Sequence, residues 1–121
     1  MGNHDFDLKV SYSNDAHTTI ISPAGGLVLE HIFRFQESWR SVTTESLVFD
    51  LSAVNYVDSA AIGSLINAQV SCTNKKRRMA LAGVSERVMQ MLKVTHVDSL
   101  FKFYPDVESA QAEVRAAAAS S

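Results

Sequence analysis

Apolar and polar residues alternate along the chain with two different periods, one typical of strands and one of helices. From Phe6 to Tyr12 every second residue is apolar, which is the period of a half-buried strand. Ser13-Asn14-Asp15 predicts a turn into a partner strand, which Pro23-Ala24-Gly25-Gly26 is expected to end. A nearly apolar run around Phe49 predicts a central strand. The predicted strands are residues 6–12, 18–22, 47–51, 79–82 and 101–104.

Helical spacing lies between and after these strands. Apolar residues recur every three or four positions up to about Arg40 and predict an amphipathic helix with Trp39 in the core. Asp58 and Ser59 open a second helix, Ser85 is expected to cap a third, and Asp106 a fourth that runs to about Ala117. The stripe predicted to face the core in the first helix is Leu29, Ile32, Phe33, Gln36 and Trp39.

The order of elements, ββαβαβαβα, predicts a single α/β domain. Strands that alternate with helices form right-handed crossovers, so the later strands are expected to be parallel. The chain should therefore form a small, mostly parallel sheet with an antiparallel edge hairpin and four helices packed on one face. The core is expected over residues 6–117, with flexible ends at 1–5 and 118–121.

Composition narrows the class of protein. The 121 residues suffice for one modest core, and a net charge of −2 argues against a general polyanion binder. No apolar run reaches the roughly 18 residues of a membrane span, and the first residues lack the pattern of a signal peptide. The single cysteine, Cys72, cannot form an internal disulfide and is expected to be a small buried hydrophobe. A cytoplasmic location follows as an expectation.

Ser59 stands out among the residues that could carry chemistry. In parallel α/β folds, functional groups gather where a strand leads into the start of a helix, and Ser59 lies at such a start. A phosphate there would meet unpaired backbone N–H groups and add about −1.5 to −2 charge to the surface. From local sequence alone, simple helix capping by Asp58 and Ser59 is favoured, because Asp and Ser dominate that position, and one residue can serve both purposes. Gly63, in the first turns of this helix, is expected to be small because of a packing contact.

The segment from Leu47 to Gly63 resembles the signature of STAS domains, the family of anti-sigma factor antagonists. In that family a strand ends in Asp-Leu-Ser, and an Asp-Ser-small-Gly-aliphatic-Gly pattern follows. Here Asp50-Leu51-Ser52 and Asp58-Ser59-Ala60-Ala61-Ile62-Gly63 stand at those positions. Residues 83–88 and 92–101 are also similar to the family. The chain departs from it at Ala61, where glycine is usual, and at Lys75-Lys76-Arg77-Arg78, a basic run the family does not require.

The resemblance implies a bacterial transcription regulator that acts by switching partners. An anti-sigma factor that is also a serine kinase would bind the unphosphorylated protein, and phosphorylation of Ser59 would end the binding. A phosphatase could restore the serine. The partner-binding residues implied by the motif are Asp50, Asp58, Ser59, Ala60, Ile62 and Gly63.

Other functions have weaker support in the sequence. Asp50 ends a strand as the phospho-acceptor of a receiver domain does, but no acidic pair for magnesium follows the earlier strands. Asp50 is instead expected to bond the backbone of the loop below Ser59. The four histidines are scattered, so no metal site is expected, and no acid–base pair or activated nucleophile indicates an enzyme. A STAS scaffold subunit of a transporter or sensory assembly, without a phospho-switch, remains the alternative.

Overall fold

A computed structural model describes residues 6–119, with side chains to residue 116. The strands are β1 Asp7–Tyr12, β2 Thr18–Leu27, β3 Ser46–Asp50, β4 Ala53–Val57, β5 Arg78–Ala82 and β6 Phe103–Tyr104. The helices are α1 Ile32–Arg40, α2 Ser59–Asn74, α3 Glu86–Val94 and α4 Val107–Ala119, with short 3-10 helices η1 Leu29–His31 and η2 Asp98–Leu100. Residues 1–5 and 120–121, most of the ends expected to be flexible, lie outside this description, while Ala118 and Ala119 complete α4.

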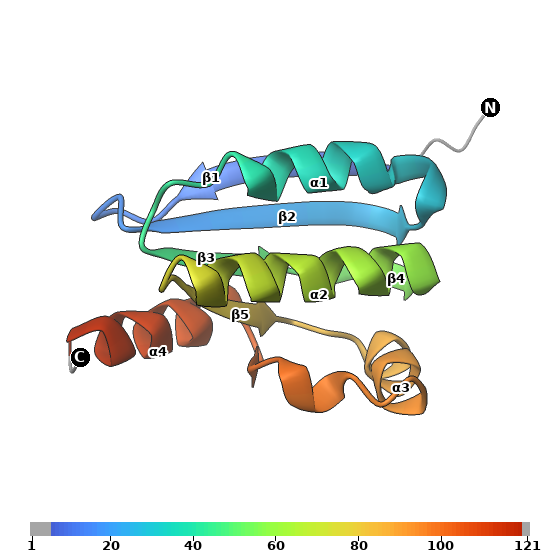
Figure 1. The fold of residues 1–121 in the computed structure, drawn as a ribbon. Coiled ribbons are helices and arrows are strands. Elements are labelled where there is room, and N and C mark those ends of the chain that lie inside the picture. Colours follow the sequence, from blue (N-terminus) through green and yellow to red (C-terminus); the bar gives the residue numbers. More distant parts are fainter. Residues whose placement is uncertain (1–5, 120–121) are drawn as a thin grey trace.

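The six strands form one mixed sheet (Figure 1). β1 pairs antiparallel with β2, and the order β2-β3-β5-β6 is parallel, as the sequence predicts. β4 also pairs parallel with β2, from Ala53 opposite Ala24 to Val57 opposite Leu27. β3 and β4 therefore follow one another along the same edge of β2, and β4 carries the chain onward to the start of α2.

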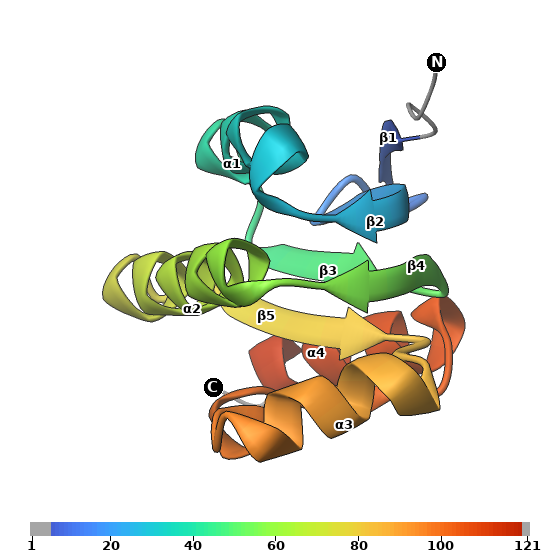
Figure 2. The same cartoon turned by 90° about the vertical axis from the view of Figure 1, so that its right-hand side faces the viewer.

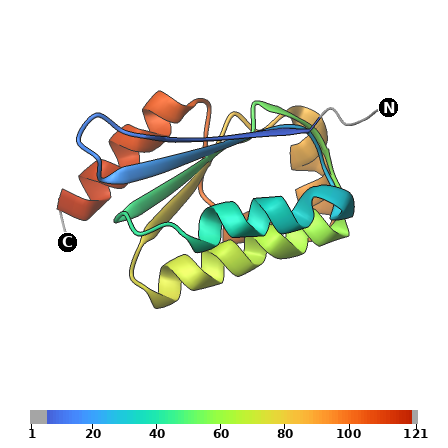
Figure 3. The same cartoon turned by 90° about the horizontal axis from the view of Figure 1, so that it is seen from above.

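Helices cover both faces of the sheet, which corrects the expectation that all four lie on one face. Figures 2 and 3 show α1 and α2 side by side on one face and α4 on the other. The larger buried cluster lies under α1 and α2 and contains Phe35, Phe49 and Leu65. A smaller cluster joins Ala110 and Val114 of α4 to the opposite face. Since β3 and β5 are apolar on both faces, a helix is needed on each side.

β2 does not end at Pro23, which is a second correction. Its pairing with β3 stops at Ile21 and its pairing with β4 begins at Ala24. Pro23 thus falls in the gap between the two neighbours, where the missing N–H removes no ladder bond on that side. The register shifts between Gly25 and Gly26, and Gly25 has φ of 105°, a conformation that favours glycine.

The buried face of the first helix matches the predicted one only in part, since Ile32 and Trp39 contact the core as predicted. Phe35 and Trp39 are buried, whereas Leu29 and Phe33 are 68% and 70% exposed. Two residues along a helix turn the side chain by about 200°, so Phe33 and Phe35 point in nearly opposite directions. Apolar residues occupy both sides of α1, so the helical spacing of apolar residues could not show which side faces the core. For Leu29 and Phe33 the prediction was wrong.

Several local predictions are confirmed. Ser85 Oγ accepts a hydrogen bond from the Val88 N–H (3.2 Å) and caps α3. The Asp106 carboxylate accepts one from the Ser109 N–H (2.7 Å) at the start of α4, which holds the pKa of Asp106 below its usual value. Trp39 belongs to the core, where its Nε1–H donates to Ser64 Oγ (3.2 Å) and ties α1 to α2.

Candidate functional site

Asp58 and Ser59 lie where β4 turns into α2, at the carboxyl end of the parallel strands. Asp58 is the helix cap, since its carboxylate accepts a hydrogen bond from the Ala61 N–H (3.0 Å). Its second oxygen accepts one from the Leu29 N–H (2.9 Å). Asp58 therefore holds η1 against the start of α2, and its role is at least partly structural.

Ser59 is the first residue of α2 and is exposed. Within residues 6–119 its hydroxyl makes no hydrogen bond, because Asp58 already supplies the cap. The N–H groups of the first helical turn and the positive end of the helix dipole lie beside it. The structure thus separates the two roles that local sequence left open, with the cap at Asp58 and an unengaged hydroxyl at Ser59.

Three other serines are placed less favourably for modification. Ser64 is 1% exposed on the inner side of α2. Ser52 Oγ donates to the Asp50 carboxylate (2.7 Å), and Ser85 Oγ is engaged in capping α3. An approaching phosphoryl group would have to displace one of these bonds or unfold part of α2.

A groove of about 460 Å³ runs from the start of α2 to α3 and includes Ser59 in its wall. Much of the lining is apolar, and the Arg87 guanidinium lies 5.7 Å from the centre of the Tyr56 ring at its edge. Val94 is 72% exposed. The remaining lining residues are Val57, Asp58, Ile62, Gln90, Met91 and Thr95.

Sequence reasoning did not include the α3 side of this groove. Met91 is half-buried and contacts both the core and the groove. Val94 closes the last turn of α3, and only the tertiary contact between α3 and β4 brings it toward Ser59. The exposed apolar Leu29, next to Asp58, adds to the same end of the molecule.

The other predicted partner-binding residues divide into two groups. Ile62 lines the groove, and the half-buried Ala60 and Gly63 lie in the first turns of α2. Asp50 lies apart from them, at the end of β3. The five residues of β4, which span roughly 16 Å at the usual rise of a strand, separate Asp50 from Ser59. Its carboxylate accepts a bond from the Ser52 N–H (3.1 Å), so it holds the β3–β4 turn.

Gly63 does not make the packing contact that the sequence suggested. A Cβ built on it would have no atom within 4 Å. The space beside this residue is open in the monomer, so its small size is not required by the fold. Gly83 is the opposite case, since its φ is 68° and a Cβ there would lie 2.9 Å from the Ser52 Cβ.

Cys72 is the small buried residue that the sequence predicts. Cys72 is 5% exposed, and burial raises the pKa of its thiol. Within the described residues, no three side chains of the metal-binding types lie together. Across the same residues, no helix has the length and apolar character needed to span a bilayer.

Comparison with known proteins agrees with the fold and the motif. The sequence model of the STAS domain matches residues 9–110. The chain belongs to the STAS domain family. That match covers the whole sheet except the start of β1, together with the Asp58-Ser59 turn and all four helices in full or in part.

Individual STAS relatives carry names that describe a regulatory role. A Thermotoga maritima protein named as an anti-sigma factor antagonist is 32% identical over 65 residues, which are 54% of this chain and 58% of that protein. This match spans little more than half of the relative's length. A crystal structure of a Thermotoga maritima protein with the same description has a TM-score of 0.79 at 26% identity, covering 93% of this chain and 96% of that chain. An anti-sigma factor antagonist from Mycobacterium paratuberculosis shares the fold, with a TM-score of 0.82 at 19% identity over 92% and 95% of the two chains.

Proposed function

We propose that this chain is an anti-sigma factor antagonist, a cytoplasmic binding module whose partner is an anti-sigma factor with serine kinase activity. The observation that carries the proposal is the exposed, unengaged Ser59 hydroxyl at the start of α2, in the wall of a largely apolar groove. In this proposal the groove and the first turns of α2 contact the partner, and Ile62, Tyr56 and Val94 supply apolar contact area.

Phosphorylation of Ser59 would end the binding through charge. The phosphate adds about −1.5 to −2 charge at a position that the partner must cover. Desolvating an unmatched charge in an interface costs roughly 2–5 kcal/mol, which corresponds to thirtyfold or weaker affinity. The fold would tolerate the modification, because Asp58 and not Ser59 caps the helix, and an anion is favoured at a helix amino terminus.

The experiment begins with affinity capture of partners from extracts of the source cells, comparing wild type with Ser59→Asp. Titration calorimetry with the captured, purified anti-sigma factor then measures the affinities of wild type, Ser59→Ala, Ser59→Asp and phosphorylated protein. We expect Ser59→Ala to bind like wild type and not to be released by ATP. Ser59→Asp should bind at least several-fold more weakly, since aspartate carries less charge than phosphate.

Ser11→Asp is the matched control, since Ser11 is an exposed serine on β1 opposite Ile20, at the other end of the sheet. It should retain the wild-type affinity. Equal affinities for wild type, phosphorylated protein and Ser59→Asp would contradict the switch. The alternative, a STAS scaffold in a transporter or sensory assembly, would then explain the surface.

A further inference from the structure

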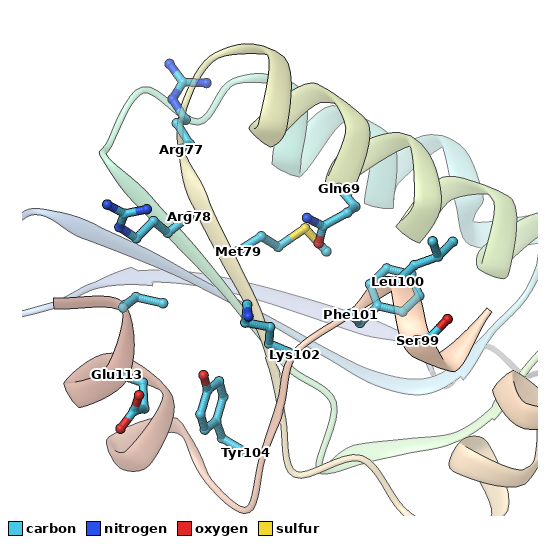
Figure 4. A pocket seen from close by; sticks show the side chains of 11 residues that line it. Gln69, Arg77, Arg78, Met79, Ser99, Leu100, Phe101, Lys102, Tyr104 and Glu113 are labelled. Carbon is cyan, nitrogen blue, oxygen red and sulfur yellow. The ribbon is translucent and has the colours of Figure 1, made fainter. Parts of the chain in front are cut away.

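A second groove, of about 400 Å³, lies at the opposite end of the molecule from Ser59, beside the beginning of β5. α2 connects the two ends, and its sixteen residues span roughly 24 Å. The groove includes Arg77 and Arg78 of the basic run that the STAS resemblance did not explain, together with Lys102. Figure 4 shows Tyr104 and Glu113 on one side of β5 and Gln69 and Leu100 on the other. The groove therefore wraps around the edge of a strand.

This edge of β5 is incompletely paired within the described chain. β6 pairs with Leu81 and Ala82, and the chain before β6 turns away into η2, so within residues 6–119 no strand lies beside Met79 and Ala80 on this side. The Arg78 N–H bonds the Glu45 carbonyl toward β3, and the Leu81 N–H bonds the Lys102 carbonyl toward β6. Because backbone groups alternate in direction along a strand, the N–H and C=O of Met79 point toward the groove.

The groove's chemistry favours an anionic, partly apolar ligand. Of the described residues that line it, Arg77, Arg78 and Lys102 are cationic and Glu113 is anionic. Met79 and Phe101 are buried and form an apolar floor, with the half-exposed Leu100 beside them. An extended peptide could continue the sheet at Met79, place alternate side chains on the floor, and direct acidic side chains toward the cations. A nucleic acid strand would gain little from the apolar floor and would meet the Glu113 carboxylate.

We propose that the open edge of β5 binds an extended acidic segment of a partner protein by strand addition, with Arg77 and Lys102 as the main charge contacts. This site is separate from the Ser59 surface. The two ends of the module would then bind two partners at once, one through a phosphorylation-sensitive surface and one through a sheet edge.

The test uses the full chain and a synthetic probe, an eight-residue peptide of alternating glutamate and valine with blocked ends. We expect saturable binding by NMR titration, with chemical-shift changes at Met79 and Lys102 and slower hydrogen exchange of the Met79 amide. Lys102→Glu and Arg77→Glu should each weaken binding about tenfold, because they place like charges opposite the peptide. Lys93→Glu, the same charge change at an exposed position of α3, should leave the affinity within about twofold of wild type.

Three results would overturn the proposal. These are no binding of the acidic peptide at millimolar concentration, equal weakening by Lys93→Glu and Lys102→Glu, or binding without protection of the Met79 amide. Equal binding of an eight-nucleotide oligothymidylate, with the same dependence on Lys102, would assign the groove to nucleic acid instead. Because Ser59→Asp should bind the peptide like wild type, failure here and failure of the phospho-switch are distinguishable.

Discussion

Asp58 and Ser59 occupy successive positions at the start of α2, but their side chains have different surroundings. The Asp58 carboxylate accepts bonds from two backbone N–H groups that lie far apart in the sequence, those of Leu29 and Ala61. The Ser59 side chain is directed to solvent at the groove. At the scale of single residues, one member of the pair positions the helix and the other is available for modification.

Phosphorylation is therefore expected at Ser59 and not at Ser52, Ser64 or Ser85. The alternatives are engaged in hydrogen bonds or buried, as the Ser52–Asp50 bond and the burial of Ser64 show. Incubation with the cognate kinase and ATP, followed by mass-spectrometric site mapping, checks this. Full incorporation of phosphate into Ser59→Ala would contradict it.

Asp58→Ala should destabilise the protein, whereas Ser59→Ala and Ser59→Asp should melt close to wild type. Loss of a cap costs about 0.5–2 kcal/mol, and Asp58→Ala also leaves the Leu29 N–H without its acceptor. The Ser59 side chain contributes no such bond, and a carboxylate at this position should stabilise the helix by roughly 0.3–1 kcal/mol. Urea denaturation of the three variants measures the differences. Unfolding of Ser59→Ala at ordinary temperature would show that Ser59 is structural.

At the scale of elements, β4 sets the distance between the two halves of the STAS motif. Asp50 and Ser59 belong to one contiguous sequence motif and are nine positions apart, but a strand lies between them. The Asp50 carboxylate was expected to bond the loop below Ser59, but it accepts its backbone bond from Ser52, at the far end of β4 from Ser59. The inclusion of Asp50 in the partner surface stays a prediction, and the geometry separates it from the groove.

α2 offers a second test through Gly63. Because a Cβ at Gly63 would meet no atom, Gly63→Ala should stabilise the protein by about 0.5–1 kcal/mol through helix propensity. Gly63→Leu should melt at or above the wild-type temperature, since leucine is also a good helix former. Thermal denaturation followed by circular dichroism checks both. A strong loss of stability in either variant would contradict the open geometry. If Gly63 faces the partner, Gly63→Leu should weaken binding while Gly63→Ala preserves it.

At the scale of the whole molecule, the sheet is covered on both faces, and α4 alone among the four helices packs on Ala80 and Val48. The two proposed binding sites lie at the two ends of the sheet. The carboxyl end carries Ser59 and its groove, and the start of β5 carries the basic groove. Each groove combines residues from elements that are far apart in the sequence.

The two-sided arrangement predicts opposite outcomes for two neighbouring alanines of α4. Ala110 is fully buried against the sheet and Ala112 is exposed. Ala110→Glu should lower the free energy of unfolding by more than about 3 kcal/mol, because it buries an unpaired charge. Ala112→Glu should change it by less than about 0.5 kcal/mol. Chemical denaturation distinguishes them, and similar stabilities would contradict the packing of α4.

The sequence by itself determined the order of elements apart from β4, the mostly parallel α/β class, the caps at Ser85 and Asp106, and the prominence of Ser59. These are local properties, since hydrophobic period, capping chemistry and a short motif depend on residues close together in the chain. The tertiary structure alone decided that Phe35 and not Phe33 is buried, that α4 covers the opposite face, that β2 continues through Pro23, and which residues form the two grooves. Those outcomes depend on the neighbour that each strand or helix finds, and such long-range contacts leave no periodic trace in the sequence.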